Sequence, residues 1–199
     1  GSQNLALDSN IIAHGDVTLN SNLTVYRNIV GSGIQFERAA QIVINAASMD
    51  CNVLVSTNTN TAIVELMDNL SMSDSSSILL FNGGFKTNNN DVAVGSLISI
   101  NNPSTATDGR SLNLGASQVI LKQKFSTQGD TSLVFSGASS EIIIGDTIGY
   151  GNDLLTEGLV FNKVILDFEP LKIGTFVLQQ KITGSNTFNH LEIDRKSVV

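Results

Sequence analysis

Carboxylates are the residues of this 199-residue chain whose type and spacing could do chemistry. Two carboxyl groups on one surface can cleave a glycosidic bond, one as an acid and the other as a base or nucleophile. The candidates lie in three short stretches: Asp146, Asp153 and Glu157; Asp167 and Glu169; Glu192 and Asp194 with Arg195. In "LEIDR" (191–195) strand alternation places Glu192 and Asp194 on one outward face, as it does on any solvated strand. The pattern identifies no catalytic residue, and a non-enzymatic role is the favoured interpretation.

Other kinds of catalytic or metal site have little support in residue spacing. The two histidines, His14 and His190, are far apart in sequence, and we expect both at surface or edge positions. No His/Cys cluster has the spacing of a zinc site, and no G-x-S-x-G motif is present. Cys51 is the one cysteine and heads an apolar stretch, which predicts a buried structural thiol.

One local pattern suggests calcium. The stretch "GYGNDLL" (149–155) fits G-x-G-x-D-x-apolar and is similar to the calcium nonapeptide of RTX repeats, in which Asp153 would be an oxygen ligand. Such sites form between consecutive copies of the repeat, and only one copy is visible here. A Gly-rich turn that closes a hairpin is the favoured interpretation, so no cofactor is predicted, with calcium at Asp153 as the alternative.

Charge and loop composition limit the partners. The net charge is −7 with a pI near 4.6, which argues against nucleic-acid binding. No run of about 18 apolar residues exists, so no membrane insertion is predicted. We expect the loops 101–110 and 145–153, with Arg110 and Tyr150, to carry binding specificity, because loops carry specificity while strands carry stability. The small groups of basic residues are expected to be solvated surface: Arg110, Lys122 and Lys124; Arg195 and Lys196.

A six-residue phrase near the start indicates the architecture that must position these groups. Residues 4–33 divide into NLALDS, NIIAHG, DVTLNS, NLTVYR and NIVGSG, and each piece opens with Asn or Asp. Alternation puts the apolar second and fourth residues of a piece on one face of a short strand, while Asn and Asp suit the corners. Strands too short to bury a face alone must stack on copies of themselves, which predicts a solenoid. We expect the corner amides to stack and to satisfy backbone groups from coil to coil.

The rest of the chain continues this alternating pattern with less regular spacing. Apolar-x-apolar triplets recur between clusters of Asn, Ser, Thr and Gly, from "IQF" (34–36) to "LEI" (191–193). This predicts an all-β parallel β-helix, with an intertwined trimeric β-prism or a β-sandwich as alternatives. Coils of about 18–24 residues would give about nine coils and a rod on the order of 40–45 Å long. Residues 1–2 have the appearance of a tag scar, and 3–199 is predicted to be one solenoid domain, regular over 4–33 and irregular over 34–199.

Several tracts resemble known surface proteins. "GDVTLNSNLTV", "GDTSLVFSGASSEIIIGD" and "GSNTFNHLEI" are similar to the passenger regions of bacterial autotransporters, to haemagglutinin-like adhesins and to phage tail-fibre shafts. The resemblance implies a β-helical protein that is secreted, displayed on a cell surface or part of a virion fibre. Residues 4–33 also resemble left-handed hexapeptide-repeat acyltransferases. That family usually has Gly after the aliphatic residue, where this chain has Ala6, Ile12, Thr18, Thr24 and Val30, so a transferase is not favoured.

The sequence therefore predicts a structural and adhesive module that presents a binding surface on a β-helical shaft. Its expected partner is a host or prey cell-surface molecule, either a glycan or a protein. The alternatives are a polysaccharide lyase or glycoside hydrolase on a β-helix, and a ligand-free homotrimeric fibre stalk.

Overall fold

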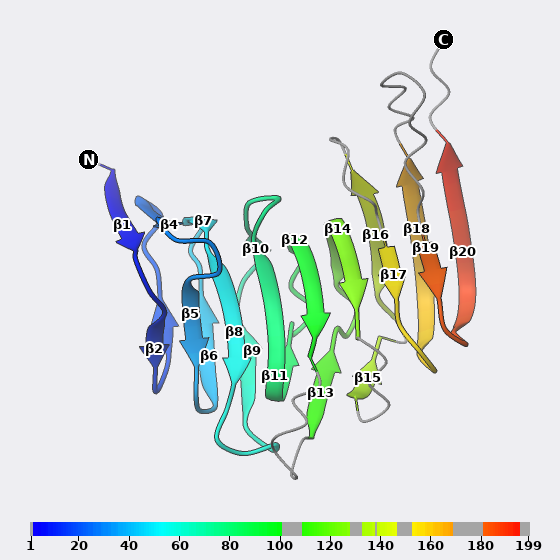
Figure 1. Cartoon of the computed structure of the whole chain (residues 1–199), viewed down its shortest axis with the longest axis horizontal. Coiled ribbons are helices and arrows are strands. Elements are labelled where there is room, and N and C mark those ends of the chain that lie inside the picture. Colours follow the sequence, from blue (N-terminus) through cyan, green and yellow to red (C-terminus); the bar gives the residue numbers. More distant parts are fainter. Residues whose placement is uncertain are drawn as a thin grey trace.

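The chain forms a column of parallel strands. The computed structural model describes residues 2–100, 109–127, 133–137, 139–146, 153–168 and 181–195. These residues contain no helix, and their strands stack into a β-solenoid of about seven turns (Figure 1). The strand pairings between coils are parallel from β1–β4 at one end to β18–β20 at the other. The predicted parallel β-helix is thus confirmed.

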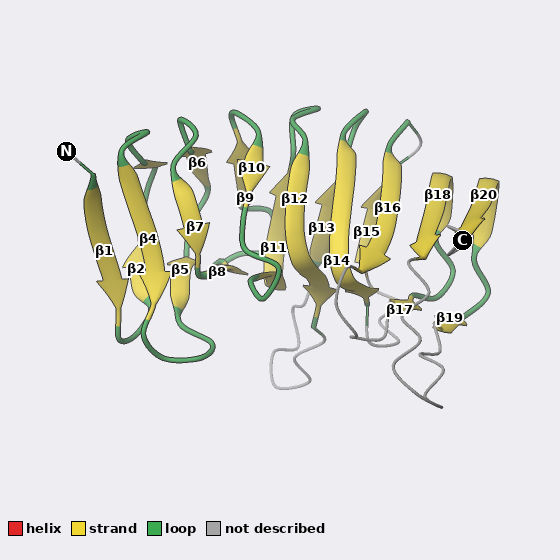
Figure 2. Cartoon of the chain, turned by 90° about the horizontal axis from the view of Figure 1, so that it is seen from above, coloured by secondary structure: helices red, strands yellow, loops and turns green. Residues whose placement is uncertain are grey.

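The strands form three faces, numbered here in the order in which the chain visits them. Face 1, whose strands lie side by side in Figure 2, contains β1 (Gln3–Leu7), β4 (Leu23–Arg27), β7 (Ser48–Asp50), β10 (Leu70–Ser71), the first parts of β12 (Val92–Ser99) and β14 (Gln118–Ser126), β16 (Glu141–Asp146), and the last parts of β18 (Val160–Phe168) and β20 (Thr187–Arg195). Face 2 contains β2 (Ile11–Ala13), β5 (Gly33–Phe36), β8 (Asn52–Ser56), the first part of β11 (Ser77–Lys86), the last parts of β12 and β14, β17 (Asp153–Leu155) and β19 (Lys181–Thr183). Face 3 contains β3 (Val17–Thr18), β6 (Ala40–Val43), β9 (Ile63–Leu66), the last part of β11, β13 (Arg110–Asn113), β15 (Leu133–Ser136), and the first parts of β18 and β20.

The core is built by aligned columns of inward side chains. Strand alternation sends every second residue inward, and the register between coils places like residues above one another. On face 2 one such column runs Val53, Ile78, Leu97, Phe125 and Leu154, all buried. Toward the C-terminal end the core includes a group of aromatic rings, whose centroids lie 5.3–6.1 Å apart: Phe125, Phe135, Phe161 and Phe188.

The coils vary more in length than the sequence suggested. Gly33 lies opposite Asn52, 19 residues further along the chain, whereas Leu97 lies opposite Phe125, 28 residues further along. The additional residues lie at the corners and leave the inward columns aligned. The described residues complete about seven turns. Nine strands follow one another on face 1, and the eight steps between them at the normal strand spacing give a column of roughly 38 Å, against the expected length of about 40–45 Å.

The inward positions predicted from the six-residue repeat of 4–33 are confirmed in part. Its fourth position is inward and buried at Leu7, Leu19 and Val25. Leu5 and Ile11 align with the inward Val25 and Ile34, yet they remain 37% and 41% exposed because they belong to the first coil, which has a neighbour on one side only. The last piece does not form a strand: residues 28–32 make a turn in which Val30 is 91% exposed.

Asn and Asp side chains build the corners, largely by bonding to the backbone of a neighbouring coil. Asp68 accepts hydrogen bonds from the backbone N–H groups of Ile44 and Asn45, at 2.7 and 2.6 Å. Asn52 Oδ1 accepts from the Ser77 N–H at 2.9 Å, and its Nδ2 donates to the Gly31 carbonyl at 3.1 Å. The expected coil-to-coil satisfaction of backbone groups is confirmed, and these contacts are made from side chain to backbone rather than by amide stacking.

The parallel pairing also settles the alternative folds. All three faces belong to one chain, which excludes the intertwined trimeric prism. A sandwich requires antiparallel Greek-key strands, which these pairings do not provide. The hairpin predicted around 149–155 is also wrong, because the flanking strands β16 and β17 each pair in parallel with β14 and with later strands. Residues 147–152 themselves, including Tyr150, lie outside the described part of the chain.

Candidate functional site

The candidate carboxylates are distributed over different faces. Asp153 begins β17 on face 2, and Glu157 follows β17 at the corner between faces 2 and 3. Asp167, Glu192 and Asp194 lie on the last strands of face 1, where the register places Asp167 opposite Asp194 on the next coil. The side chain of Asp146 and all of Glu169 lie outside the described residues. The solenoid therefore does not bring Asp153 and Asp167 together as an acid–base pair.

A polar row crosses the outer surface of face 1. Gln118, Glu141, Lys163 and His190 are aligned on successive coils by the strand register. Lys163 Nζ lies 2.6 Å from a Glu141 carboxylate oxygen and 3.8 Å from one of Glu192, and Gln118 Nε2 donates to Glu141 at 2.9 Å. His190 lies on the same surface and is exposed, 3.6 Å from Glu192. As expected, both histidines are on the surface, with His14 at the corner after β2, 3.6 Å from Glu37.

The two carboxylates with lowered pKa values, Glu141 and Glu65, stabilise the fold rather than serve as catalytic acids. Hydrogen bonds from Lys163 and then Gln118 hold the pKa of Glu141 below its usual value. On face 3, hydrogen bonds from Asn88 and then Lys86 lower the pKa of Glu65 in the same way. A catalytic general acid needs a raised pKa, so these two groups have the opposite tuning. They act as ion-pairing groups that link neighbouring coils.

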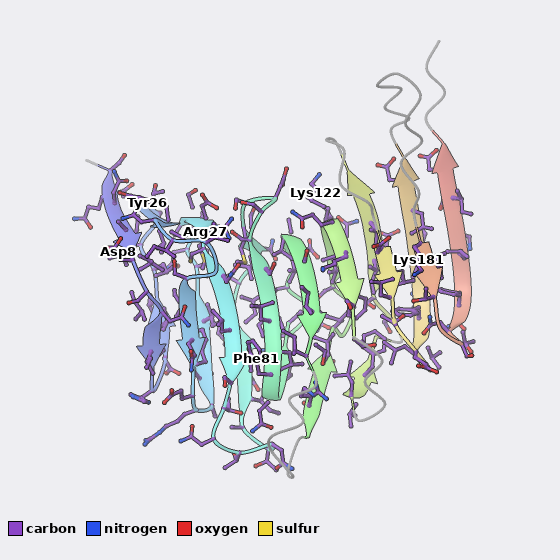
Figure 3. All side chains as sticks on the ribbon, viewed as in Figure 1. Asp8, Tyr26, Arg27, Phe81, Lys122 and Lys181 are labelled. Atoms are coloured by element: carbon purple, nitrogen blue, oxygen red, sulfur yellow. The ribbon has the colours of Figure 1, made fainter. Side chains whose placement is uncertain are left out.

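A second polar cluster lies where face 1 turns into face 2. The Arg27 guanidinium donates to the backbone carbonyl of Ser75 at 3.1 Å and to its hydroxyl at 2.7 Å, and it lies 3.9 Å from an Asp50 oxygen. Ser73 donates to the same Asp50 oxygen. Figure 3 shows Arg27 at the end of β4, with Lys122 further along the same edge of the solenoid. Arg27 connects coils 48 residues apart in sequence, a contact that no local pattern could indicate.

Cys51 is the buried structural thiol that the sequence predicted. Its side chain is completely buried in the hydrophobic core. Burial, with a smaller contribution from the negative charge of Asp50, raises the pKa of the Cys51 thiol to about 11. A thiol of this kind is inert, because the thiolate is the reactive form.

The prediction that Arg110 is a solvated surface residue is wrong. It opens β13 and is 1% exposed, the largest of the fully buried side chains. The sequence held a signal for this position: Arg110 is two residues before the buried Leu112, so alternation puts it on the inward face. Its role as a binding residue stays untested, since residues 101–108 of its loop lie outside the described part.

Two lysines and an aspartate form a row of alternating charge on face 2. The register aligns Lys124, Asp153 and Lys181 on three successive coils, and Figure 3 shows Lys181 on β19. Beside this row a hollow opens toward face 3, lined by Lys124, Ser126, Leu155, Thr156, Glu157, Thr183 and Gly184. The Thr156 hydroxyl is buried and has no hydrogen-bond partner among the described residues. The row and the hollow combine ammonium, carboxylate and hydroxyl groups, which suits recognition of a polar ligand.

Metal binding and membrane insertion have no support in the described residues. Asp153 is aligned with two lysines rather than with other oxygen ligands, and no group of three His, Cys, Asp or Glu residues in the described part of the chain could hold a metal ion. Over the same residues, no helix is long and apolar enough to span a membrane.

Comparisons with protein-family models, with curated proteins and with solved structures find no match to this chain.

Proposed function

We propose that this chain is a structural and adhesive module of an exported or surface-displayed protein, and that it presents a binding surface on a β-helical shaft. Its partner is a host or prey cell-surface molecule, a glycan or a protein. The observation that carries the proposal is the alternating row of Lys124, Asp153 and Lys181, which the register aligns on three successive coils beside the polar hollow.

The position of the two candidate loops supports face 2 as the binding face. Residues 101–108 connect the face 2 part of β12 to β13, and residues 147–152 connect β16 to β17 on face 2. Both connections therefore begin or end at an edge of face 2. Loops bear recognition while the stacked strands supply the rigid support, and this division suits an attachment module.

The ligand chemistry follows from the side chains. Lys124 and Lys181 can bind carboxylate or sulfate groups, and Asp153, Ser126 and Thr183 can hydrogen-bond to hydroxyl groups. The chain has no Trp, and a stacking platform of aromatic rings is not part of this surface as described. An acidic glycan is accordingly the preferred ligand class.

Binding to an array of neutral and acidic oligosaccharides tests the proposal. We expect acidic glycans to bind, and the double variant Lys124→Glu/Lys181→Glu to weaken that binding at least tenfold. Arg38→Glu is the control for Lys181→Glu alone, because each reverses one charge and Arg38 is exposed next to β5. Equal loss in the control would show general charge attraction, and no binding to any glycan would remove the glycan class. Release of new reducing ends or unsaturated products from the bound glycans would instead indicate the polysaccharide-cleaving alternative.

A further inference from the structure

The outer surface of face 1 carries an apolar column on four successive coils. The strand register aligns Ala93, Ile120, Ile143 and Ile165, and each is half-buried on the outward side of its strand. The column continues to the polar residues Ser71 at one end and Glu192 at the other. An aliphatic column on the outside of a sheet is unusual, since outward positions are normally polar.

The polar row described above runs beside this apolar column. Two more residues, Asn69 and Asp91, belong to the row at one end. Asn69 and Asp91 precede the paired Leu70 and Val92, so the whole row runs Asn69, Asp91, Gln118, Glu141, Lys163 and His190. Its charges are unevenly placed: Asp91 and Glu141 are negative, and Lys163 is positive. This order of charges is what a second copy of the same surface can complement.

We propose that face 1 is a dimer interface, in which it packs against face 1 of a second copy with the two solenoid axes antiparallel. The two-fold axis runs along the strands, midway between β14 and β16. This operation reverses the order of the coils, so that β14 faces β16, β12 faces β18 and β10 faces β20 of the second copy.

With the coils in reverse order, the apolar column and the polar row of one copy each meet complementary residues of the other copy. Ile120 lies against Ile143, and Ala93 against Ile165, so the apolar column buries itself along its full length. In the polar row Asp91 meets Lys163, and the Gln118 amide meets the Glu141 carboxylate. Charged groups are thus paired with opposite charges or with hydrogen-bond donors, which is the complementarity that specific interfaces show.

Neighbouring registers are less favourable. Placing the axis on β16 brings Glu141 against Glu141 of the second copy, and like charges across an interface are repulsive. Placing it between β16 and β18 sets Ile120 against Glu192 and leaves fewer strands in contact. The sequence of side chains along face 1 therefore selects one register.

The area fits a weak dimer. Strand spacing of about 4.8 Å and a rise of about 3.3 Å per residue give the overlapping strands of face 1 a footprint of roughly 500 Å² per copy. Both copies together then bury about 1,000 Å², which is near the lower limit for a specific interface. We accordingly expect association in the micromolar range, weakened by salt because ion pairs at the rim contribute to it.

Sedimentation equilibrium from micromolar to millimolar concentration tests the proposal. The native chain is expected to pass from the 21.1 kDa monomer to a dimer as concentration rises. Ile143→Lys should weaken dimerisation at least tenfold with an unchanged circular dichroism spectrum. Val134→Lys is the matched control, because Val134 is an outward residue of face 3 that is 69% exposed, and it should leave dimerisation unchanged. A monomer at all concentrations, a trimer, or a dimer that responds to Val134→Lys and not to Ile143→Lys would overturn the proposal.

Cross-linking tests the antiparallel orientation. In the proposed dimer the two Ile120 residues lie close to the axis, whereas the two Ser71 residues are about five coils, or roughly 24 Å, apart along the solenoid. A short bifunctional maleimide should cross-link the Ile120→Cys variant and not the Ser71→Cys variant, and the buried Cys51 should not react. Cross-linking of both variants would show a parallel arrangement and contradict the proposed geometry.

Discussion

Ala46 occupies a backbone conformation that is unfavourable for a residue with a side chain. Its φ is +59°, in the turn between faces 3 and 1, next to Asn45 at +50°. The corresponding turns two coils later and beyond use Asn88, Asn89 and Gly115 in the same region. Asn and Gly tolerate left-handed backbone, whereas Ala pays a steric cost of about 1–2 kcal/mol.

Ala46→Gly should therefore stabilise the protein by about 0.5–1 kcal/mol, because the relief of strain exceeds the added freedom of the unfolded chain. The shift of the urea unfolding midpoint measures the gain. Ala116→Gly is the control: Ala116 is an exposed residue of an equivalent turn without positive φ, so it should gain nothing. Equal effects at the two positions would contradict this explanation.

Cys51 should resist thiol reagents in the folded protein, because it is buried and its thiol pKa is raised to about 11. Reaction with a chromogenic disulfide should occur only as the protein unfolds in urea. A Val30→Cys variant supplies the comparison, since Val30 is exposed in a turn, and the added thiol should react at once under native conditions. Rapid modification of native Cys51 would show that the core around it opens.

At the scale of elements, strands could be predicted from the sequence but corner contacts could not. The apolar-x-apolar triplets identify strands such as β5, β8 and β16, because period-two alternation is a local property. The stretch "TAIVELMDNLSM" (61–72) forms β9 and β10 for the same reason. The bond from Arg27 to Ser75 depends on which coils become neighbours, and corner lengths that vary from coil to coil hide that information.

The ion pairs between coils predict how stability depends on pH. The pKa values of Glu141 and Glu65 are lowered in the folded protein by their hydrogen-bond partners. Such groups stabilise the fold above the unfolded pKa of about 4.3, and this contribution is lost as the pH falls through their folded values. The free energy of unfolding should thus decline below about pH 4.3, and less steeply in the double variant Glu65→Gln/Glu141→Gln.

Urea unfolding measured from about pH 6 to about pH 3 checks this dependence. Glu157→Gln is the control, because it makes the same change of charge at an exposed corner residue. The prediction fails if the control flattens the profile as much as the double variant does.

For the whole molecule, the arrangement of coils predicts a gradient of local stability. Central coils are covered on both sides, whereas the first coil exposes the inward residues Leu5 and Ile11, and Ile193 of β20 is exposed at the other end. In a solenoid each unit contacts only its neighbours, so the terminal units have the least support. Hydrogen exchange followed by mass spectrometry should show the slowest exchange in β8, β11 and β12, and the fastest in β2 and β19. Uniform protection would indicate that the column unfolds as a single unit.

The location of the proposed binding surface was the property least accessible to sequence analysis. Lys124, Asp153 and Lys181 are 29 and 28 residues apart, and their alignment appears only when the coil lengths are known. Arg110 shows the converse case, in which a charged residue suggested surface binding although alternation with Leu112 placed it inside. The two candidate loops could be named from composition, but the strands that they connect could be assigned to faces only from the register.

The unequal coil lengths have a mechanical consequence. Bonds between coils lie along the column, so tension applied at its two ends should break them one coil after another rather than all together. Each released coil of 19 to 29 residues would add roughly 65–100 Å of extended chain. In an optical trap the molecule should lengthen in a series of uneven steps, so that the column dissipates applied force gradually instead of failing at once.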